Sequence, residues 1–314
     1  MIARIKDLAC NGIERQFDYF IVFKNCEDRS YIISKKIQSK VSNWIIIESS
    51  LVRDKIEQEE REKYEDIIAF LRSKQIENYD VAVLDGDTRW DNTVLSTINQ
   101  DDSIGIDMSS FGFYELSDLL FYLLIYKKVN CIDIFYTEPG LYNIERYFDY
   151  EPKQYNYSIN YPQSLISTNP SNTELFVSVI GFEKRVASTI KEEFEATEYY
   201  SLNGFPSYYL KAKDISLINN KEYLEDIHQN NRLSSEASNP FLCYNTLLSI
   251  SKKNNDFMTI CPLGTKPMTL GVILFALSHD TCRVVYPSDK SIMSKSVGVG
   301  KSYVYSIPGE LFLD

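Results

Sequence analysis

The stretch FMTICPLGTKPMTLGVILFALSHDTCRVVY, residues 257–286, decides the predicted fold. An apolar run at 257–261 is typical of a buried strand, and the polar turn after it leads into an apolar run at 266–278 that has the length of a helix. A second strand-like run follows at 281–286. A strand, a helix and another strand joined by short turns predict a βαβ unit, in which the two strands are parallel.

The same alternation of strand-like and helix-like runs extends over most of the chain. Further strand-like runs lie at residues 18–23, 43–48, 79–84, 103–107, 130–136, 174–180, 198–202 and 302–307. Continuous apolar strands separated by helices are typical of sheets that are covered on both faces. We therefore predict an α/β protein with two Rossmann-like lobes, mainly parallel sheets and helices on both faces.

The length of 314 residues is enough for two domains. Residues 142–173 are rich in Tyr, Asn, Pro and Ser and have no clear period. We predict lobes at 1–141 and 174–314, with 142–173 as the segment that connects them. A weak internal repeat favours two related lobes, because residues 104–139 and 258–287 share the same order of strand, polar turn, apolar helix and strand.

The charge balance argues against one broad class of function. Lys and Arg together number 33 and Asp and Glu number 44, which gives a net charge of −11. Coating a nucleic acid requires a basic face, so we expect no such role, although a local basic pocket is compatible with this charge. We expect the acidic exterior to face a protein partner or a second copy of the chain.

The sequence also predicts a compartment. No apolar run approaches the 18 residues of a membrane-spanning helix, so we expect no membrane partner. Residues 1–21 carry charges throughout, which is unlike a signal peptide. We therefore expect a cytoplasmic protein with reduced thiols.

Cysteine and histidine spacing gives no metal or redox motif. There are only two histidines, His228 and His279, and His279 follows a helix-like run, where a cation at a helix C-terminus is favoured. No pair has C-x-x-C spacing among Cys10, Cys26, Cys131, Cys243, Cys261 and Cys282. We expect buried thiols, no metal site of this kind and no histidine-based triad.

The turn after the strand at 257–261 is the sharpest candidate for chemistry. Ligands of open parallel sheets bind beyond the carboxyl ends of the strands. Gly264 allows close approach of the backbone, Thr265 is a natural N-cap, and Lys266 opens the helix. Helix N-terminal amides and a lysine make a site for an anion, although the spacing is not that of a Walker A loop. The alternative is an ordinary turn with a surface lysine.

This arrangement of a strand, a polar turn, Gly-Thr-Lys-x-Met and an apolar helix resembles the motif of CARF domains. These are Rossmann-like sensors of cyclic oligoadenylate in prokaryotic antiviral defence. The resemblance covers residues 257–286 and implies that Gly264, Thr265 and Lys266 contact a ligand. CARF domains usually have a second glycine where this chain has Leu263, and the nuclease domain of typical effector members is not evident here.

A second candidate turn follows the strand at 174–180. Gly181 begins it, and Arg185 stands near the start of a helix, where a basic residue is unfavourable unless an anion compensates it. We therefore predict Gly181 and Arg185 as further ligand contacts. Residues 295–301, with Gly298, Gly300 and Lys301, form a candidate lid in this interpretation.

Acidic residues at strand ends leave a catalytic alternative open. Asp85, Asp87 and Asp107 each follow a predicted strand, and two or three such carboxylates can hold Mg²⁺ for phosphoryl chemistry. Asp107 can equally cap the next helix. Only the hypothesis of a hydrolase requires Mg²⁺. If the protein is not a hydrolase, we expect no cofactor.

Three functions remain in order of preference. The first is a sensor or accessory subunit of a prokaryotic antiviral defence system that binds a nucleotide or another phosphorylated ligand. The second is a metal-dependent nucleotide or phosphodiester hydrolase. The third is a non-catalytic structural subunit of a protein complex.

Overall fold

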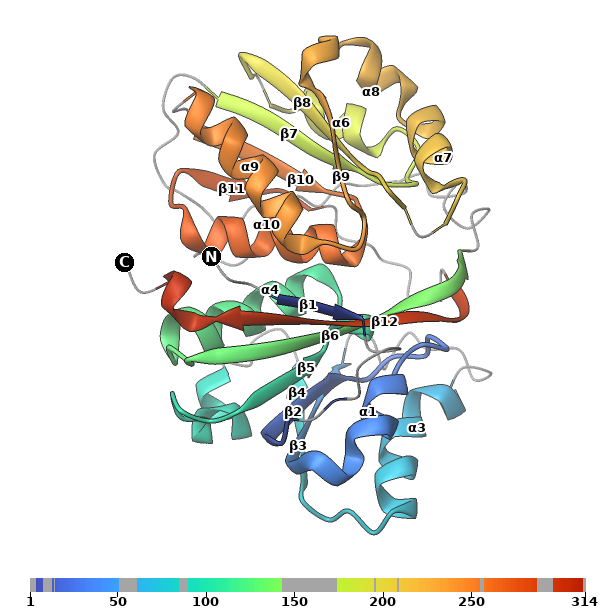
Figure 1. Cartoon of the computed structure of the whole chain (residues 1–314), viewed down its shortest axis with the longest axis vertical. Helices are drawn as coiled ribbons and strands as arrows, with labels where there is room; N and C mark the ends of the chain where they lie inside the picture. Colours follow the sequence, from blue (N-terminus) through green and yellow to red (C-terminus); the bar gives the residue numbers. More distant parts are fainter. Residues whose placement is uncertain are drawn as a thin grey trace. The chain divides into compact units, whose positions relative to one another are not determined.

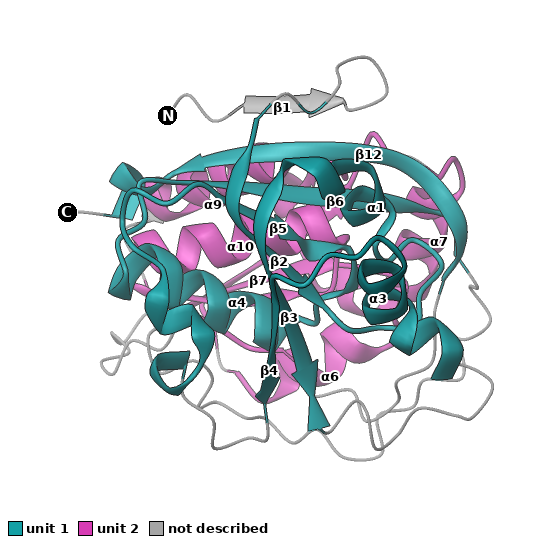
Figure 2. Cartoon of the chain, turned by 90° about the horizontal axis from the view of Figure 1, so that it is seen from below, with its two compact units in different colours: residues 1–142, 290–314 teal, residues 143–289 magenta. Residues whose placement is uncertain are grey.

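The chain folds into two compact units, each built on its own sheet. The computed structural model describes residues 4–7, 13, 15–50, 61–84, 90–142, 174–194, 196–207, 209–254, 257–286 and 296–312. Unit 1 combines Met1–Tyr142 with Lys290–Asp314, and unit 2 is Asn143–Asp289, coloured teal and magenta in Figure 2. The tyrosine-rich residues 143–173 lie outside the described part.

Unit 1 contains a seven-stranded sheet in the order β1-β12-β6-β5-β2-β3-β4 (Figure 1). Five of its strands are mutually parallel, and β12 and β1 add to one side in antiparallel pairing. The strands are β1 (Arg4–Asp7), β2 (Phe17–Phe23), β3 (Val41–Ser49), β4 (Tyr79–Leu84), β5 (Ile104–Asp107), β6 (Cys131–Tyr142) and β12 (Ser296–Pro308).

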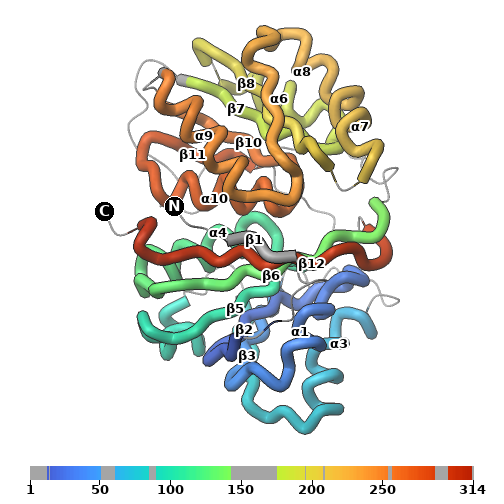
Figure 3. The backbone as a smooth tube through the Cα atoms, in the orientation of Figure 1, coloured from blue at the N-terminus to red at the C-terminus, as the bar shows by residue number. Residues whose placement is uncertain are grey.

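Unit 2 contains a five-stranded sheet in the order β11-β10-β7-β8-β9, and all of its neighbouring strands are parallel. The strands are β7 (Glu174–Ile180), β8 (Glu198–Gly204), β9 (Arg232–Ser235), β10 (Phe257–Pro262) and β11 (Cys282–Val284). The tube in Figure 3 shows how the chain passes through a helix between successive strands.

The two units share one topology. If the five parallel strands of each unit are numbered along the chain, both sheets have the spatial order 3-2-1-4-5. This is the order of a Rossmann-like, doubly wound sheet. The repeated segments of the sequence are the fourth and fifth strands with their helix, β5-α4-β6 in unit 1 and β10-α10-β11 in unit 2. The predicted fold class, α/β with mainly parallel sheets, is confirmed.

Helices lie between the strands of both units. In unit 1 they are α1 (Ile32–Ile37), α3 (Arg61–Ser73) and α4 (Phe113–Phe121), and in unit 2 α6 (Val186–Glu192), α7 (Ala212–Asn219), α8 (Lys221–Glu225), α9 (Pro240–Asn254) and α10 (Lys266–Ser278). Helix α10 is buried over most of its length, which suits a helix that is apolar on every face. None of the described helices is both long and apolar enough to cross a membrane.

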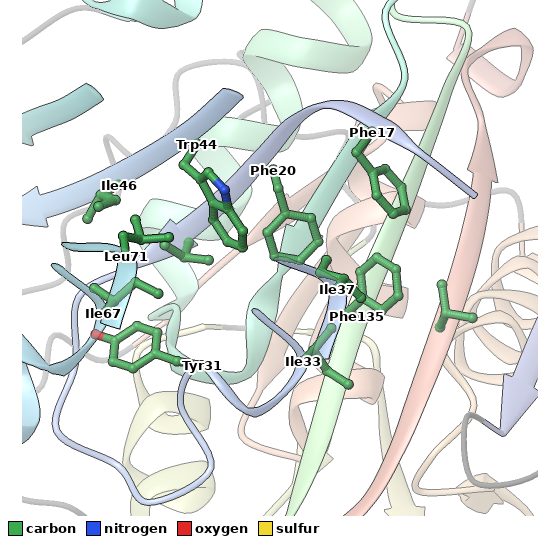
Figure 4. Packing of buried hydrophobic residues seen from close by; sticks show 12 residues of the cluster. Phe17, Phe20, Tyr31, Ile33, Ile37, Trp44, Ile46, Ile67, Leu71 and Phe135 are labelled. Atoms are coloured by element: carbon green, nitrogen blue, oxygen red, sulfur yellow. The ribbon is translucent and has the colours of Figure 1, made fainter. Parts of the chain in front are cut away.

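The core of unit 1 is rich in aromatic side chains (Figure 4). Phe20 of β2 packs edge-on against Trp44 of β3, with ring centroids 5.3 Å apart. Helices α1 and α3 cover this face of the sheet with Ile33, Ile37, Ile67 and Leu71. The alternate residues of the strands face the opposite side and are equally buried, which explains their continuous apolar pattern.

The core of unit 2 lies on two faces of its sheet. On one face, Phe176 and Ile180 of β7 pack with residues of α6 and α8. On the other face, α9 and α10 pack together and against β9 and β10. Cys243, Cys261 and Cys282 are buried in this unit, and burial raises the pKa of the Cys243 and Cys282 thiols to about 12. These thiols stay protonated, as expected for packing residues.

The end of the chain differs from our predicted boundary. We placed residues 174–314 in the C-terminal lobe, but β12 pairs with β6 from Ser296 opposite Tyr142 to Pro308 opposite Cys131. The antiparallel partner is in unit 1, so the last strand completes the first sheet. The predicted lid is also wrong for the described residues from 296 onward, because Gly298 and Lys301 lie within this paired strand.

Candidate functional site

The shared topology defines one switch point in each sheet. Strands 1 and 4 are neighbours at this point. The chain continues from strand 1 to strand 2 on one side, and from strand 4 to strand 5 on the other side. In unit 2 these strands are β7 and β10, and in unit 1 they are β2 and β5. A ligand of such a sheet binds outside the carboxyl ends of these two strands.

In unit 2, the two turns predicted from sequence meet at the switch point. The turn that begins at Gly181 follows β7, and the turn with Gly264 follows β10. A methyl group added to Gly181 would lie 1.8 Å from the carbonyl oxygen of Leu263. The Leu263 N–H donates to the carbonyl of Val179 at 2.8 Å. The structure therefore brings Gly181 and Gly264 together, although their segments are far apart in the sequence.

The carbonyl groups of the first turn are held by two asparagines at the junction of α7 and α8. Asn220 Nδ2 donates to Gly181 O at 3.0 Å, and Asn219 Nδ2 donates to Phe182 O at 2.6 Å. In a trans peptide the N–H points opposite to the C=O. The N–H groups of Phe182 and Glu183 are therefore directed away from this junction. No local sequence pattern singles out these asparagines, because their partners are remote in the chain.

Asn220 is expected to contribute more to stability than Asn219. Asn220 is buried and donates to both Gly181 O and Ser216 O, whereas Asn219 is half-buried and has one such bond. Asn220→Ala leaves buried carbonyls without these donors and is expected to destabilise the protein by about 1–3 kcal/mol. Asn219→Ala is expected to lower the free energy of unfolding by only about 0.5–1.5 kcal/mol.

Urea unfolding of both variants measures this difference. Asn245→Ala is the matched control, because Asn245 is exposed on α9 and alanine favours a helix. Equal stability of all three variants would show that the asparagines do not hold the turn.

The second turn has the features of a helix N-terminal anion site. Thr265 is the N-cap of α10, and its Oγ1 accepts a hydrogen bond from the Met268 N–H. The same hydroxyl donates to the carbonyl of Ala237, which fixes the turn against the segment after β9. Lys266 is the first residue of α10, where amides and the helix dipole favour negative charge.

Arg185 is placed differently from the glycine and lysine contacts. It stands at the start of α6 in the left-handed region, with φ 64°, and its exposed guanidinium lies 3.2 Å from Glu222. An exposed pair of this kind contributes little to stability, so an anionic ligand competes with Glu222 at small cost.

Glu183 is a component that the sequence analysis did not single out. Its Oε2 would lie 2.6 Å from a methyl group on Gly181, so the carboxylate folds back beneath the turn. It also lies near Cys261, where the negative charge adds to burial in raising the pKa of that thiol. A carboxylate at this edge lowers the local positive potential, which makes the charge of Lys266 more important for binding an anion.

The switch point of unit 1 has the opposite chemistry, because carboxylates neutralise its cations. Buried Lys24 follows β2 and lies 2.8 Å from Glu48 and 2.9 Å from Glu65. Buried Arg29 lies 2.5 Å from Glu27 and donates to the Thr137 carbonyl at 3.1 Å. These pairs leave the turn after β2 poorly suited to phosphate.

The ends of β6 and β12 also attach to this turn in unit 1. Ser296 Oγ donates to Glu27 at 3.1 Å, and the Gly298 N–H donates to Asp28 at 2.9 Å. This amide is the main reason why the pKa of Asp28 is below its ordinary value. The paired strands therefore bind the turn where unit 2 has its candidate site.

The predicted acidic site is only partly described. Asp85 and Asp87 lie outside the described residues. Asp107 is buried, and its Oδ1 accepts from the Ser109 N–H at 3.1 Å, so that it caps the turn Met108–Ser110. This is the capping role that the sequence left open. Within the described residues, no group of three or more His, Cys, Asp or Glu side chains could hold a metal ion.

Comparisons with known proteins do not add a family. No model of a protein family matches this chain, and no curated protein matches it. The candidate site therefore rests on the geometry of unit 2.

Proposed function

We propose that unit 2 binds a phosphorylated small molecule, a nucleotide or nucleotide-derived signal, at the switch point between β7 and β10. The observation that carries this proposal is the convergence of the turns at Gly181 and Gly264 outside the carboxyl ends of these strands. The ligand phosphate contacts Gly181, the Gly264–Thr265 backbone and the Lys266 ammonium. Arg185 reaches the phosphate once it leaves Glu222.

The resemblance of the Gly264 turn to the CARF motif supports a role as sensor. In this proposal the chain is a sensor or accessory subunit of a prokaryotic antiviral defence system, and its acidic exterior faces a protein partner. In this proposal the site binds its ligand without turning it over.

Thermal unfolding against a panel of phosphate compounds tests the proposal. The panel consists of ATP, NAD, linear and cyclic oligoadenylates and inorganic tripolyphosphate, each with and without Mg²⁺. A ligand at 100 times its Kd stabilises the folded chain by about 2.7 kcal/mol. In a protein of this size, each kcal/mol raises Tm by about 2–4 °C.

Lys266→Ala is expected to weaken binding of the active compound by roughly 10- to 150-fold, because a hydrogen bond to a charged group contributes about 1.5–3 kcal/mol. Lys252→Ala is the matched control, since Lys252 is exposed in the last turn of α9 and its loss changes the net charge equally. A flat panel, or equal binding by the two variants, would contradict the proposed site. Appearance of a metal-dependent product would favour the hydrolase instead.

A further inference from the structure

An exposed aromatic residue lies beside the turn that begins at Gly181. Phe205 follows β8, and the register of β8 with β7 places Asn203 opposite Ile180. Phe205 is therefore one strand away from the Gly181 turn and at nearly the same level, a separation of roughly 5–10 Å. It remains 48% exposed, although it is a large apolar side chain.

Hydrogen bonds connect the Phe205 segment to the second turn. The Phe205 N–H donates to Ser235 O at 2.7 Å, and the Ala237 N–H donates to Pro206 O at 3.0 Å. The carbonyl of the same Ala237 accepts from Thr265 Oγ1. The backbone at Phe205 is thus fixed relative to the N-terminus of α10.

A lysine orients the ring. Lys213 Nζ, on α7, lies 4.4 Å from the centroid of the Phe205 ring, which is a cation–π distance. This contact covers one face of the ring, and the exposed fraction leaves area for a planar group. An exposed ring held in this way, one strand from the Gly181 turn, can serve as a stacking surface next to the proposed phosphate site.

We infer that Phe205 stacks against the base of the ligand, so that the site selects nucleotides over other phosphate compounds. This inference rests on the proposed function, because the phosphate must bind at the Gly181 and Gly264 turns. A ribose bridges the base on Phe205 and the phosphate on Lys266. Aromatic side chains stack on bases without requiring a particular base, so the inferred class is nucleotides in general.

The test compares the nucleotides of the panel with tripolyphosphate, which has phosphates but no base. Calorimetric titration of the full chain gives Kd for each compound. Phe205→Ala is expected to raise the Kd of the nucleotides by about 5- to 150-fold. The Kd of tripolyphosphate is expected to stay within twofold of its value for the unchanged protein. Phe205→Trp is expected to retain nucleotide affinity. Phe205→Leu keeps an apolar side chain but no aromatic ring, and it is expected to lose most of the preference for nucleotides over tripolyphosphate.

Leu210→Ala is the control for loss of an exposed apolar side chain, because Leu210 is 94% exposed between β8 and α7. If no compound binds, the proposed function fails and the inference fails with it. If tripolyphosphate binds as tightly as every nucleotide, the phosphate site stands and the stacking role is overturned. The stacking role is also overturned if Phe205→Ala weakens the binding of nucleotides and of tripolyphosphate equally, or if it weakens the binding of neither.

Discussion

Replacing Lys24 with methionine is expected to destabilise unit 1 by about 3–5 kcal/mol, because it removes the cation of a buried ion pair and leaves a buried carboxylate without that partner. The Lys24 side chain is 2% exposed, and the Glu48 carboxylate 2.8 Å away is 9% exposed. Glu65, the second partner, is half exposed and remains solvated without the lysine. The cost therefore comes mainly from Glu48.

Denaturant unfolding of two further variants tests this explanation. Lys35→Met breaks an ion pair of similar length, but Lys35 and Asp66 are 38% and 42% exposed, so we expect a loss below about 1 kcal/mol. Adding Glu48→Gln to Lys24→Met removes the buried charge and is expected to recover most of the stability. A loss from Lys24→Met no larger than that from Lys35→Met would show that Glu48 does not depend on the lysine.

The strands could be predicted from sequence where they are buried on both faces. The runs at 18–23 and 174–180 match β2 and β7 closely, because most of their apolar residues are buried. Strand β9 was missed, since Arg232–Ser235 is short, mostly polar and at the edge of its sheet. The extent of β12 was missed because its glycines and lysine look like a loop until the pairing with β6 is known.

The site could be predicted only as separate pieces. Gly181 and the Gly264–Lys266 turn stand out because each follows a strand and opens a helix. Their meeting depends on β7 and β10 being neighbours, and no local pattern determines that order. Asn220 and Phe205 gave no signal for the same reason, since their roles depend on contacts with remote segments.

Gly181→Ala is expected to be the most damaging change in unit 2. The added methyl group would lie 1.8 Å from Leu263 O and 2.8 Å from Leu263 C, both of which are backbone atoms. A flexible side chain can rotate away from such a contact, but here the two turns must separate. Overpacking of this kind typically costs about 1–3 kcal/mol, and we expect a loss of at least about 2 kcal/mol, or roughly 4–8 °C in Tm.

Gly112→Ala provides a control of similar steric closeness in unit 1. Its methyl group would lie 2.4 Å from Glu115 Oε2, which is the far end of a flexible side chain. The carboxylate can move away, so we expect a loss below about 1 kcal/mol. Differential scanning calorimetry of both variants measures the contrast directly.

The same variant connects stability with binding. Separating the turns moves the Gly181 backbone away from the N-terminus of α10, so the ligand that stabilises the unchanged protein is expected to give a much smaller shift for Gly181→Ala. Lys266→Ala is expected to reduce that shift with a smaller loss of stability, because the close approach of the turns joins Gly181 to the Leu263 carbonyl. If Gly181→Ala is as stable as Gly112→Ala, then the turns do not touch, and the convergence on which the site rests is wrong.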